Sequence, residues 1–334
     1  MIHPYHKGVL MSLKERQDYC VKIIKELRAE LNRVPTSADF KNKLPRINVT
    51  ELFGSHDGLL RAAGLLEAIE EFEGPQPRQP RILVLDLELK PIIAYVWGLF
   101  DQNIGLDQII QDWSIMSWAA KWIGESNVMY EDVSGEGDYS NDERIVRLMW
   151  HKLDEADVII TQNGKKFDEK KLNTKFEKYK LGRPSPYRHI DTLKIKKKHF
   201  GLTSNKLAYS TDYFNETYKK LDHGKFAGMK LWIECLNRNP EAWAEMKEYN
   251  IYDVLSLEEL YLNSLRHWDD TINFGTYTQK AGCCPNCGSE DLFEDKFNYS
   301  KTGAFQTYRC KNCGTISQSK INEIHQNTRK AFLK

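Results

Sequence analysis

Residues 81–90 read Arg81-Ile-Leu-Val-Leu-Asp-Leu-Glu-Leu-Lys90, a run of apolar residues that also carries two acids. Its first half is an apolar, β-favouring run that predicts a buried strand. Asp86 and Glu88 stand two residues apart in that strand, so both carboxylates leave the same face. Two buried like charges cost free energy unless a cation or a proton neutralises them. The pair is therefore either an exposed strand end with solvated acids or a shared ligand pair for Mg²⁺ or Mn²⁺, which prefer oxygen ligands.

The composition limits the class of protein. The chain has 334 residues, enough for two or three units, and its 48 Lys and Arg against 47 Asp and Glu give a net charge of only +1. No run of about eighteen apolar residues and no signal-peptide pattern is present, so we expect no membrane partner. Five of the seven cysteines cluster near the C-terminus. That clustering favours metal binding in a reducing compartment over disulfides, and we expect a cytoplasmic location.

Residues 1–68 predict a small helical module. Apolar residues recur at helical spacing over residues 13–31, and Thr36-Ser37 can cap a second short helix through Phe40. The pattern Arg-x-Pro-Thr, Phe-Gly-Ser and Leu-x-x-Ala-Ala-Gly that ends at Gly64 resembles a helical repeat attached to homing endonucleases. The resemblance implies a DNA-binding module. The alternative is a plain helical cap on the next domain.

The central domain is predicted over residues 82–270, after a linker at 69–81 that carries three prolines and a glycine. A turn at residues 101–105 indicates an antiparallel meander in its first part. A row of tryptophans, Trp113, Trp118 and Trp122, favours a helix. The predicted elements are strands at 82–89, 92–100, 128–130 and 157–161, and helices at 113–122 and 144–153. Meandering strands followed by alternating strands and helices predict an α/β fold with a mixed sheet flanked by helices.

Two further motifs bring acids to this domain. The strand at 157–161 runs into Gln162-Asn163-Gly-Lys-Lys-Phe167-Asp168, and an acid just beyond a strand's carboxyl end lies where α/β sheets place their sites. Helix capping by Asp168 is the alternative. Tyr249 and Asp253 are four residues apart in a predicted helix and share one face. Asp253 either joins a metal cluster, with the Tyr249 hydroxyl near a water, or simply faces solvent.

Taken together, the three motifs resemble the DEDD superfamily of 3′–5′ exonucleases, which have a ribonuclease-H-like fold. They are Asp86-x-Glu88, Asn163-x-x-x-Phe167-Asp168 and Tyr249-x-x-x-Asp253, in that order, over residues 80–270. The tyrosine four residues before the last acid is typical of the tyrosine branch of that superfamily. Residues 94–104 also resemble bacteriophage-encoded exonuclease-like proteins of the family-B polymerase type.

The resemblance implies hydrolysis of phosphodiester bonds with two divalent ions, releasing 5′-mononucleotides from a 3′ end. The implied ligands of the two Mg²⁺ or Mn²⁺ are Asp86, Glu88, Asp168 and Asp253. Tyr249 would orient the attacking water, because its pKa, ordinarily near 10, makes it a poor base at neutral pH. Asn163 and Phe167 would position the terminal nucleotide.

The local charge agrees with a nucleic-acid partner. Between Lys165 and Lys198 the chain has thirteen basic residues and four acids, with Phe and Tyr interleaved. Such a segment beside a carboxylate site suits a phosphodiester substrate, and Lys165 and Lys166 are candidate substrate contacts. The alternative is a solvated helix face. His189 and Asp191 could extend the site, but we expect structural roles for both at a strand end.

The cysteines form two knuckles, Cys284-Pro-Asn-Cys287-Gly and Cys310-Lys-Asn-Cys313-Gly. Four thiolates at this spacing predict one structural Zn²⁺ with no open position for catalysis. The pattern predicts a zinc ribbon at 281–320 followed by a basic tail at 321–334. The alternative register would use the spare thiol of Cys283. From Lys296 onward the chain has eight basic residues and one acid, so ribbon and tail are either nucleic-acid contacts or stabilising parts.

The sequence therefore predicts a metal-dependent exonuclease, with single-stranded or frayed DNA expected rather than RNA. Three alternatives stay open: an RNA exonuclease, a structure-selective endonuclease on the same site, and a catalytically silent nucleic-acid-binding protein. The presence of all four acids and Tyr249 argues against the last. The sequence does not predict an oligomeric state.

Overall fold

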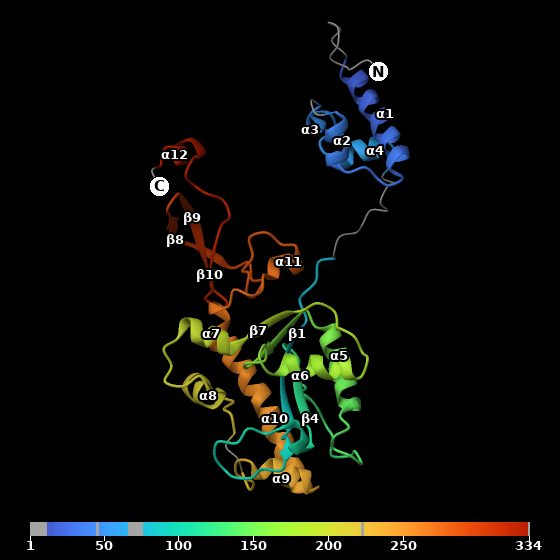
Figure 1. The fold of residues 1–334 in the computed structure, drawn as a ribbon. Helices are drawn as coiled ribbons and strands as arrows, with labels where there is room; N and C mark the ends of the chain where they lie inside the picture. Colours follow the sequence, from blue (N-terminus) through green and yellow to red (C-terminus); the bar gives the residue numbers. More distant parts are fainter. Residues whose placement is uncertain (1–11, 45–46, 66–75, 222–223, 333–334) are drawn as a thin grey trace. The chain divides into compact units, whose positions relative to one another are not determined.

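A computed structural model describes residues 12–44, 47–65, 76–221 and 224–332. The chain divides into two compact units, Met1–Pro75 and Gln76–Lys334 (Figure 1). The division falls inside the predicted linker, whose residues 69–75 lie outside the described ranges. Residues 76–81 belong to the second unit, where the Arg78 guanidinium donates to both carboxylate oxygens of Asp157 at 2.5 Å.

The first unit is helical, as predicted. Its helices are α1 (Leu13–Leu31), α2 (Ser37–Lys43), α3 (Val49–Phe53) and α4 (His56–Ala62). Ser12 and Thr36 cap the first two helices through capping boxes, and Asn32 ends α1 in the left-handed conformation. Cys20, Ile24 and Phe40 are among the residues of its buried core.

A mixed five-stranded sheet forms the centre of the second unit and confirms the predicted α/β class. Its strands are β1 (Ile82–Lys90), β4 (Ser114–Trp122), β5 (Met129–Asp132), β6 (Val158–Thr161) and β7 (Arg188–Asp191), in the order β5-β4-β1-β6-β7. β1 pairs antiparallel with β4 and parallel with β6. The stretch that carries the acid pair is therefore the central strand.

Alternate residues of β1 enter different cores. Leu83 and Leu85 pack in one core with residues of α5 (Glu143–Glu155) and α6 (Asp168–Lys178). Ile82 and Val84 pack in another with residues of α10 (Pro240–Leu260). Asp86 and Glu88 continue the Ile82 and Val84 row, so they leave the sheet on the side that α10 covers.

Two predictions for this unit are wrong. Residues 113–122 form no helix; β4 occupies Ser114–Trp122, and all nine of its residues are buried. A strand buried on both faces does not alternate between apolar and polar residues, so its sequence lacks the period of two that identifies a strand. The strand predicted at 92–100 shrinks to β2 (Ile93–Ala94), which pairs with β3 (Ile109–Gln111) in a separate two-stranded sheet. Residues 95–100 are largely exposed and pack against no apolar surface, so the strand does not continue through them.

The second unit contains further short helices. They are α7 (Thr192–His199), α8 (Leu207–Phe214), α9 (Lys230–Leu236), α11 (Phe274–Thr278) and α12 (Gln326–Lys330), with a short 3-10 helix at Leu106–Gln108. α10 continues into a π turn (Tyr261–Leu265) and a 3-10 turn (Arg266–Trp268). The C-terminal strands β8 (Leu292–Ser300), β9 (Gly303–Cys310) and β10 (Ile316–Gln318) form a three-stranded antiparallel sheet. Among the described residues, no helix combines the length and apolarity needed to cross a bilayer.

Candidate active site

Three predicted acids meet between β1 and α10. Carboxylate oxygens of Asp86, Glu88 and Asp253 all lie within 4.8 Å of one another. Asp86 and Glu88 face Ala119 and Ser117 of β4, and the ladder shifts register immediately after Glu88. A bulge at this point bends the strand end, as is common beside functional sites. The fold thus gathers three hard oxygen ligands in the arrangement that a divalent cation requires.

Asp168 approaches the same place from the start of α6. It is buried, and its carboxylate accepts hydrogen bonds from its own backbone N–H and from that of Leu87, which lies between the two acids of β1. Its charge also raises the pKa of both Asp86 and Glu88. Asp168 is not part of the tight group of three, but it acts on the same charge cluster. It does not cap α6, because the N-cap position is Phe167 and no side chain bonds there.

The acids are electrostatically strained without a cation. Burial, followed by repulsion from Asp253, raises the pKa of Glu88 to about 8, and the same causes raise the pKa of Asp86 well above its ordinary value. Burial raises the pKa of Asp168 to about 7. Four carboxylates held together against solvation and mutual repulsion are suited to binding divalent cations. The donor set therefore fits Mg²⁺ or Mn²⁺.

A lysine that the sequence analysis missed faces the cluster. The Lys220 ammonium donates to Asp253 and lies 4.3 Å from the centre of the Tyr249 ring. Burial by itself would lower the pKa of Lys220, but Asp253, Tyr249 and Asp86 raise it above its ordinary value. Lys220 comes from the segment between α8 and α9, which carries no motif, so nothing in the sequence pointed to it. It brings a fixed positive charge to the edge of the acid cluster.

Tyr249 lies beside the acids, as its spacing from Asp253 predicted. Burial, followed by the charge of Asp253, raises the pKa of Tyr249 to about 12, so its hydroxyl stays protonated at neutral pH. The Trp232 ring meets the Tyr249 ring edge-on at 6.1 Å, and the Trp232 side chain is hydrogen-bonded to Glu88. α9, which carries Trp232, thereby fixes both a candidate ligand and the tyrosine.

Asn250 is a second residue that the sequence analysis missed. Its side chain is fully buried, and its Nδ2 donates to Oδ2 of Asp86 at 2.8 Å. Its Oδ1 accepts from the buried Ser117 hydroxyl at 3.1 Å. Ser117 thus fixes Asn250, and Asn250 fixes the carboxylate of Asp86. The available signal was its position within the third motif, one residue after Tyr249.

The loop between β6 and α6 carries the predicted substrate contacts. Asn163 adopts a left-handed backbone (φ 65°), and its N–H donates to Asp191 at 2.9 Å. The backbone of Gly164 packs against the Thr161 side chain. A Cβ at position 164 would lie 2.1 Å from the Thr161 hydroxyl oxygen, so the turn requires glycine. The loop ends in Phe167, whose side chain is 41% exposed. Lys166 is exposed and Lys165 is partly exposed. The loop therefore holds an aromatic ring and two cations outward.

His189 and Asp191 have the structural roles that we expected. The Nε2 of His189 lies 2.8 Å from the Thr161 hydroxyl, and its Nδ1 lies 3.1 Å from Glu169. Asp191 accepts from the backbone N–H groups of Asn163 and Leu193. Both residues hold the loop in place, and the charge of Asp191 also contributes to the raised pKa of Asp168.

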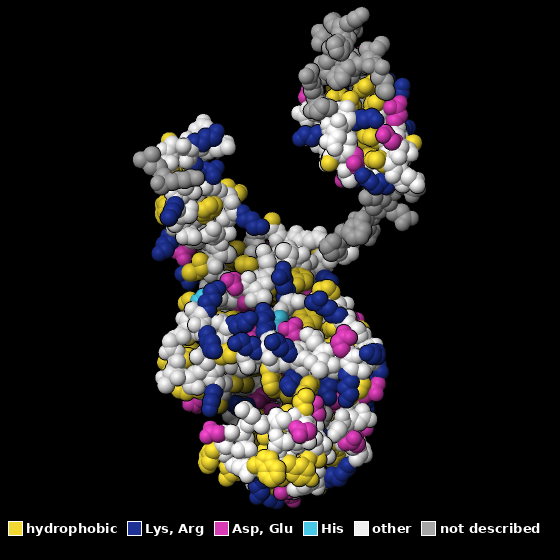
Figure 2. Space-filling model, viewed as in Figure 1, with side chains coloured by type: hydrophobic (Ala, Val, Ile, Leu, Met, Phe, Trp, Pro, Cys, Tyr) yellow, Lys and Arg dark blue, Asp and Glu magenta, His cyan; other side chains and the backbone are white. Residues whose placement is uncertain are grey.

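The basic segment contributes fewer free charges than its composition suggested. Lys175 is buried in an ion pair with Asp142 at 2.7 Å, and Lys196 is fully buried against the Ser210 hydroxyl at 2.6 Å. The others include exposed lysines such as Lys166, Lys194 and Lys197. Figure 2 shows Lys and Arg side chains in a row on one side of a hollow in the second unit, with acidic side chains inside it.

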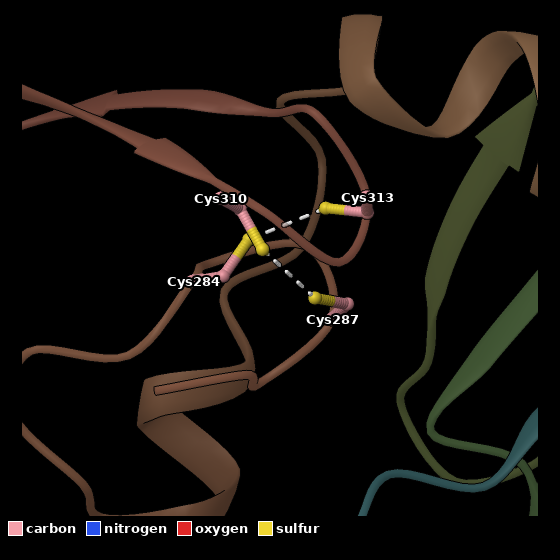
Figure 3. Close-up of side chains that lie close together, drawn as sticks. All are labelled: Cys284, Cys287, Cys310 and Cys313. Atoms are coloured by element: carbon pink, nitrogen blue, oxygen red, sulfur yellow. Dashed lines mark hydrogen bonds between the residues drawn. The ribbon is translucent and has the colours of Figure 1, made fainter. Parts of the chain in front are cut away.

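The four knuckle cysteines form a second cluster at the C-terminal sheet. One ligand atom from each of Cys284, Cys287, Cys310 and Cys313 lies within 4.8 Å of the others. The sulfurs of the two knuckles face one another, with Cys284 to Cys313 at 3.5 Å and Cys287 to Cys310 at 3.6 Å (Figure 3). This cluster could hold one zinc ion. Cys283 lies outside it, with its thiol directed to the Lys280 carbonyl.

The family comparison agrees with this fold. The model of a family described as the RNase_H superfamily matches residues 120–264, a range that includes Asp168, Tyr249 and Asp253. No curated protein matches the chain. Among solved structures, the chain is similar to the family B DNA polymerase of the hyperthermophilic archaeon Pyrobaculum calidifontis. That match has 15% identity and a TM-score of 0.44, and it covers 61% of this chain but only 28% of the polymerase.

The second unit thus has a ribonuclease-H-like fold: a mixed five-stranded sheet flanked by helices, with acids on the central strand. Residues 120–264, which the family model matches, include β6, β7 and α10 of this fold.

Proposed function

We propose that this chain is a metal-dependent 3′–5′ exonuclease that hydrolyses single-stranded or frayed DNA to 5′-mononucleotides. The observation that carries the proposal is the meeting of Asp86, Glu88 and Asp253 within 4.8 Å, with Tyr249 beside them. Each of the three sequence motifs therefore contributes an acid to one cluster, because the charge of Asp168 also raises the pKa of Asp86.

In this proposal Asp86, Glu88, Asp168 and Asp253 would hold two Mg²⁺ or Mn²⁺. Such ions supply charge neutralisation at the scissile phosphate and a nucleophilic water at neutral pH. Asn250 fixes the orientation of Asp86 through its 2.8 Å hydrogen bond. Trp232 does the same for Glu88. The chain's own contribution is thus a set of carboxylates whose rotamers are held before substrate arrives.

The neighbouring side chains suit the substrate. The protonated Tyr249 hydroxyl can donate to or orient a water, but it cannot act as a base at neutral pH. Lys220 carries a positive charge next to Asp253, where it can meet a phosphate oxygen. Phe167 offers an exposed ring for stacking on a terminal base, with Asn163, Lys165 and Lys166 in the same loop.

Cleavage of 5′-labelled DNA and RNA of one sequence tests the proposal, with Mg²⁺, Mn²⁺ or EDTA. We expect a metal-dependent ladder that shortens from the 3′ end of DNA and is absent for Asp253→Asn. Glu241→Gln is the matched control, because Glu241 lies on the same helix but its side chain is 64% exposed.

The other outcomes identify the alternatives. Preferred cleavage of the RNA strand would indicate an RNA exonuclease, and discrete internal cuts would indicate an endonuclease. Binding without cleavage of either strand would indicate a silent nuclease fold.

A further inference from the structure

The segment between β1 and β4 exposes an unusual amount of apolar surface. Within the described ranges, the five most exposed large apolar side chains all lie in it. They are Trp97 (96% exposed), Leu99 (90%), Leu106 (88%), Phe100 (84%) and Tyr95 (74%). Exposed apolar surface of this extent marks a binding site rather than ordinary surface.

This segment is folded, so the backbone holds its rings outward. β2 pairs with β3, and the Tyr95 N–H donates to the Gln108 carbonyl at 2.9 Å. The Gln108 side chain returns a hydrogen bond to the Tyr95 carbonyl at 2.9 Å and accepts one from the Gly105 N–H at 2.8 Å. We call residues 92–110 the aromatic hairpin.

The aromatic hairpin follows directly after β1, the strand that carries Asp86 and Glu88. Ile92 follows Glu88 by four residues, a span of about 13 Å in an extended chain. Figure 2 shows hydrophobic side chains gathered on the side of the hollow opposite the row of Lys and Arg. They lie in the region where Figure 1 draws the teal segment after β1. A strand in the hollow would therefore meet cationic side chains on one side and hydrophobic side chains on the other.

The charge of the hairpin decides what it can contact. Between Pro91 and Asp112 the chain has three aspartates and no lysine or arginine. Such a segment repels phosphates, so it cannot track a nucleic-acid backbone. Its aromatic rings can stack on bases, and stacking needs bases whose faces are free.

We propose that the aromatic hairpin is a stacking platform for the unpaired bases of a single-stranded nucleic acid whose phosphates face the lysine row. This inference rests on the proposed function, because it names the form of substrate that reaches the acid cluster. In this inference Tyr95, Trp97 and Phe100 select unpaired strands by stacking on their bases. The Lys and Arg side chains of the row in Figure 2 bind the phosphates.

The test is a binding titration of the full-length chain in EDTA, which prevents cleavage. The probe is a fluorescein-labelled oligothymidylate of about twelve nucleotides, within the usual range of single-strand sites. We expect Trp97→Ala to raise Kd by about 5- to 150-fold, the range that loss of one base–aromatic stack gives. The salt dependence of Kd should keep its slope, because no phosphate contact is lost.

Tyr213→Ala is the matched control. Tyr213 is an aromatic residue of α8, outside the hairpin, and is 68% exposed; its truncation should leave Kd unchanged. Because Trp97 is almost fully exposed, Trp97→Ala should also keep the wild-type melting temperature.

Unchanged oligothymidylate affinity in Trp97→Ala overturns the inference. So does a concentration-dependent dimer of the wild type that Trp97→Ala abolishes while binding the oligonucleotide normally; the hairpin would then dock a second copy. The same oligonucleotide with Mg²⁺ separates this inference from the proposed function. Cleavage by the wild type with normal binding by Trp97→Ala refutes only the platform. Weak binding by Trp97→Ala without any cleavage by the wild type refutes only the exonuclease.

Discussion

The second unit holds two clusters of metal-binding side chains, and they are built in opposite ways. The thiol cluster comes from two short turns of the same construction. In each, the glycine N–H donates to the first cysteine carbonyl at 2.9 Å, as Gly288 does to Cys284 and Gly314 to Cys310. Both glycines have a left-handed backbone, near φ 75°. Each knuckle thus shapes itself, and only their meeting depends on the rest of the chain.

In the acid cluster only the pair Asp86 and Glu88 is local. Its members come from β1, from the start of α6 and from the middle of α10. They are oriented by residues from still other places, such as Ser117 of β4 and Trp232 of α9. The comparison indicates that loss of a thiol should damage structure, whereas loss of an acid should damage chemistry and relieve strain.

The largest expected effect is on the thiol side. Cys310 is buried within the cluster, so Cys310→Ser should reduce bound zinc from one ion per chain to almost none. Structural zinc contributes directly to folding, so the C-terminal sheet should lose several kcal/mol and become sensitive to protease. Elemental analysis and limited proteolysis measure both effects. Cys283→Ser is the control and should keep its zinc; zinc retained by Cys310→Ser would contradict the four-thiol site.

A smaller effect is expected for the residue that orients Asp86. Asn250→Ala removes the 2.8 Å hydrogen bond, and partners of this kind are worth about 10- to 100-fold in activity or metal affinity. Ser117→Ala should cost less, because it acts only through Asn250. Steady-state kinetics should show the loss in kcat, with oligonucleotide Kd in EDTA unchanged. If Asn250→Ala and the wild type have equal kcat at equal distance below their melting temperatures, Asn250 contributes only to packing.

The acid cluster also predicts a stabilising substitution. Asp86→Asn keeps an acceptor for Asn250 but removes one of the charges that repel Glu88 and Asp253. Without metal, we expect the variant to be more stable than the wild type by about 1 kcal/mol. Mg²⁺ should raise the melting temperature of the wild type and raise that of Asp86→Asn less, since one ligand is gone. Equal Mg²⁺ shifts would exclude Asp86 as a ligand.

The same contrast explains what the sequence could predict. The knuckles and the acid pair of β1 depend on spacing along the chain, so the group of four cysteines and the shared face of Asp86 and Glu88 followed from the sequence. The mixed sheet followed from the order of strand and helix signals. β4 did not, because a strand buried on both faces lacks the alternation that identifies a strand.

The contacts of Lys220 and Asn250 did not follow from the sequence. Lys220 meets Asp253 across 33 residues, and Asn250 meets Asp86 across 164. Neither contact has a spacing that a single sequence could reveal. A count of charges along the chain is misleading for the same reason, because Lys175 and Lys196 belong to the basic segment and are buried.

Lys196 gives the most specific prediction. Burial lowers its pKa to about 8 from an ordinary 10.5. Between these two values the unfolded chain binds more protons at this site than the folded chain, so the site makes the free energy of unfolding rise with pH. Below about pH 8 the buried ammonium is charged in both states, and folding bears the full cost of burying it.

Lys196→Met removes this titration while keeping the length of the side chain. Ser210 stays satisfied, because its hydroxyl also donates to the carbonyls of Lys206 and Leu207. Urea unfolding should therefore show the stability of the wild type rising relative to the variant from about pH 8 to pH 10. Parallel curves would contradict a depressed pKa. Oligonucleotide binding should be unchanged in Lys196→Met, whereas Lys166→Ala, at an exposed lysine, should lower the salt slope by about one. Comparing Lys196→Met with Lys166→Ala therefore distinguishes the lysines of residues 165–198 that contact phosphates from those that do not.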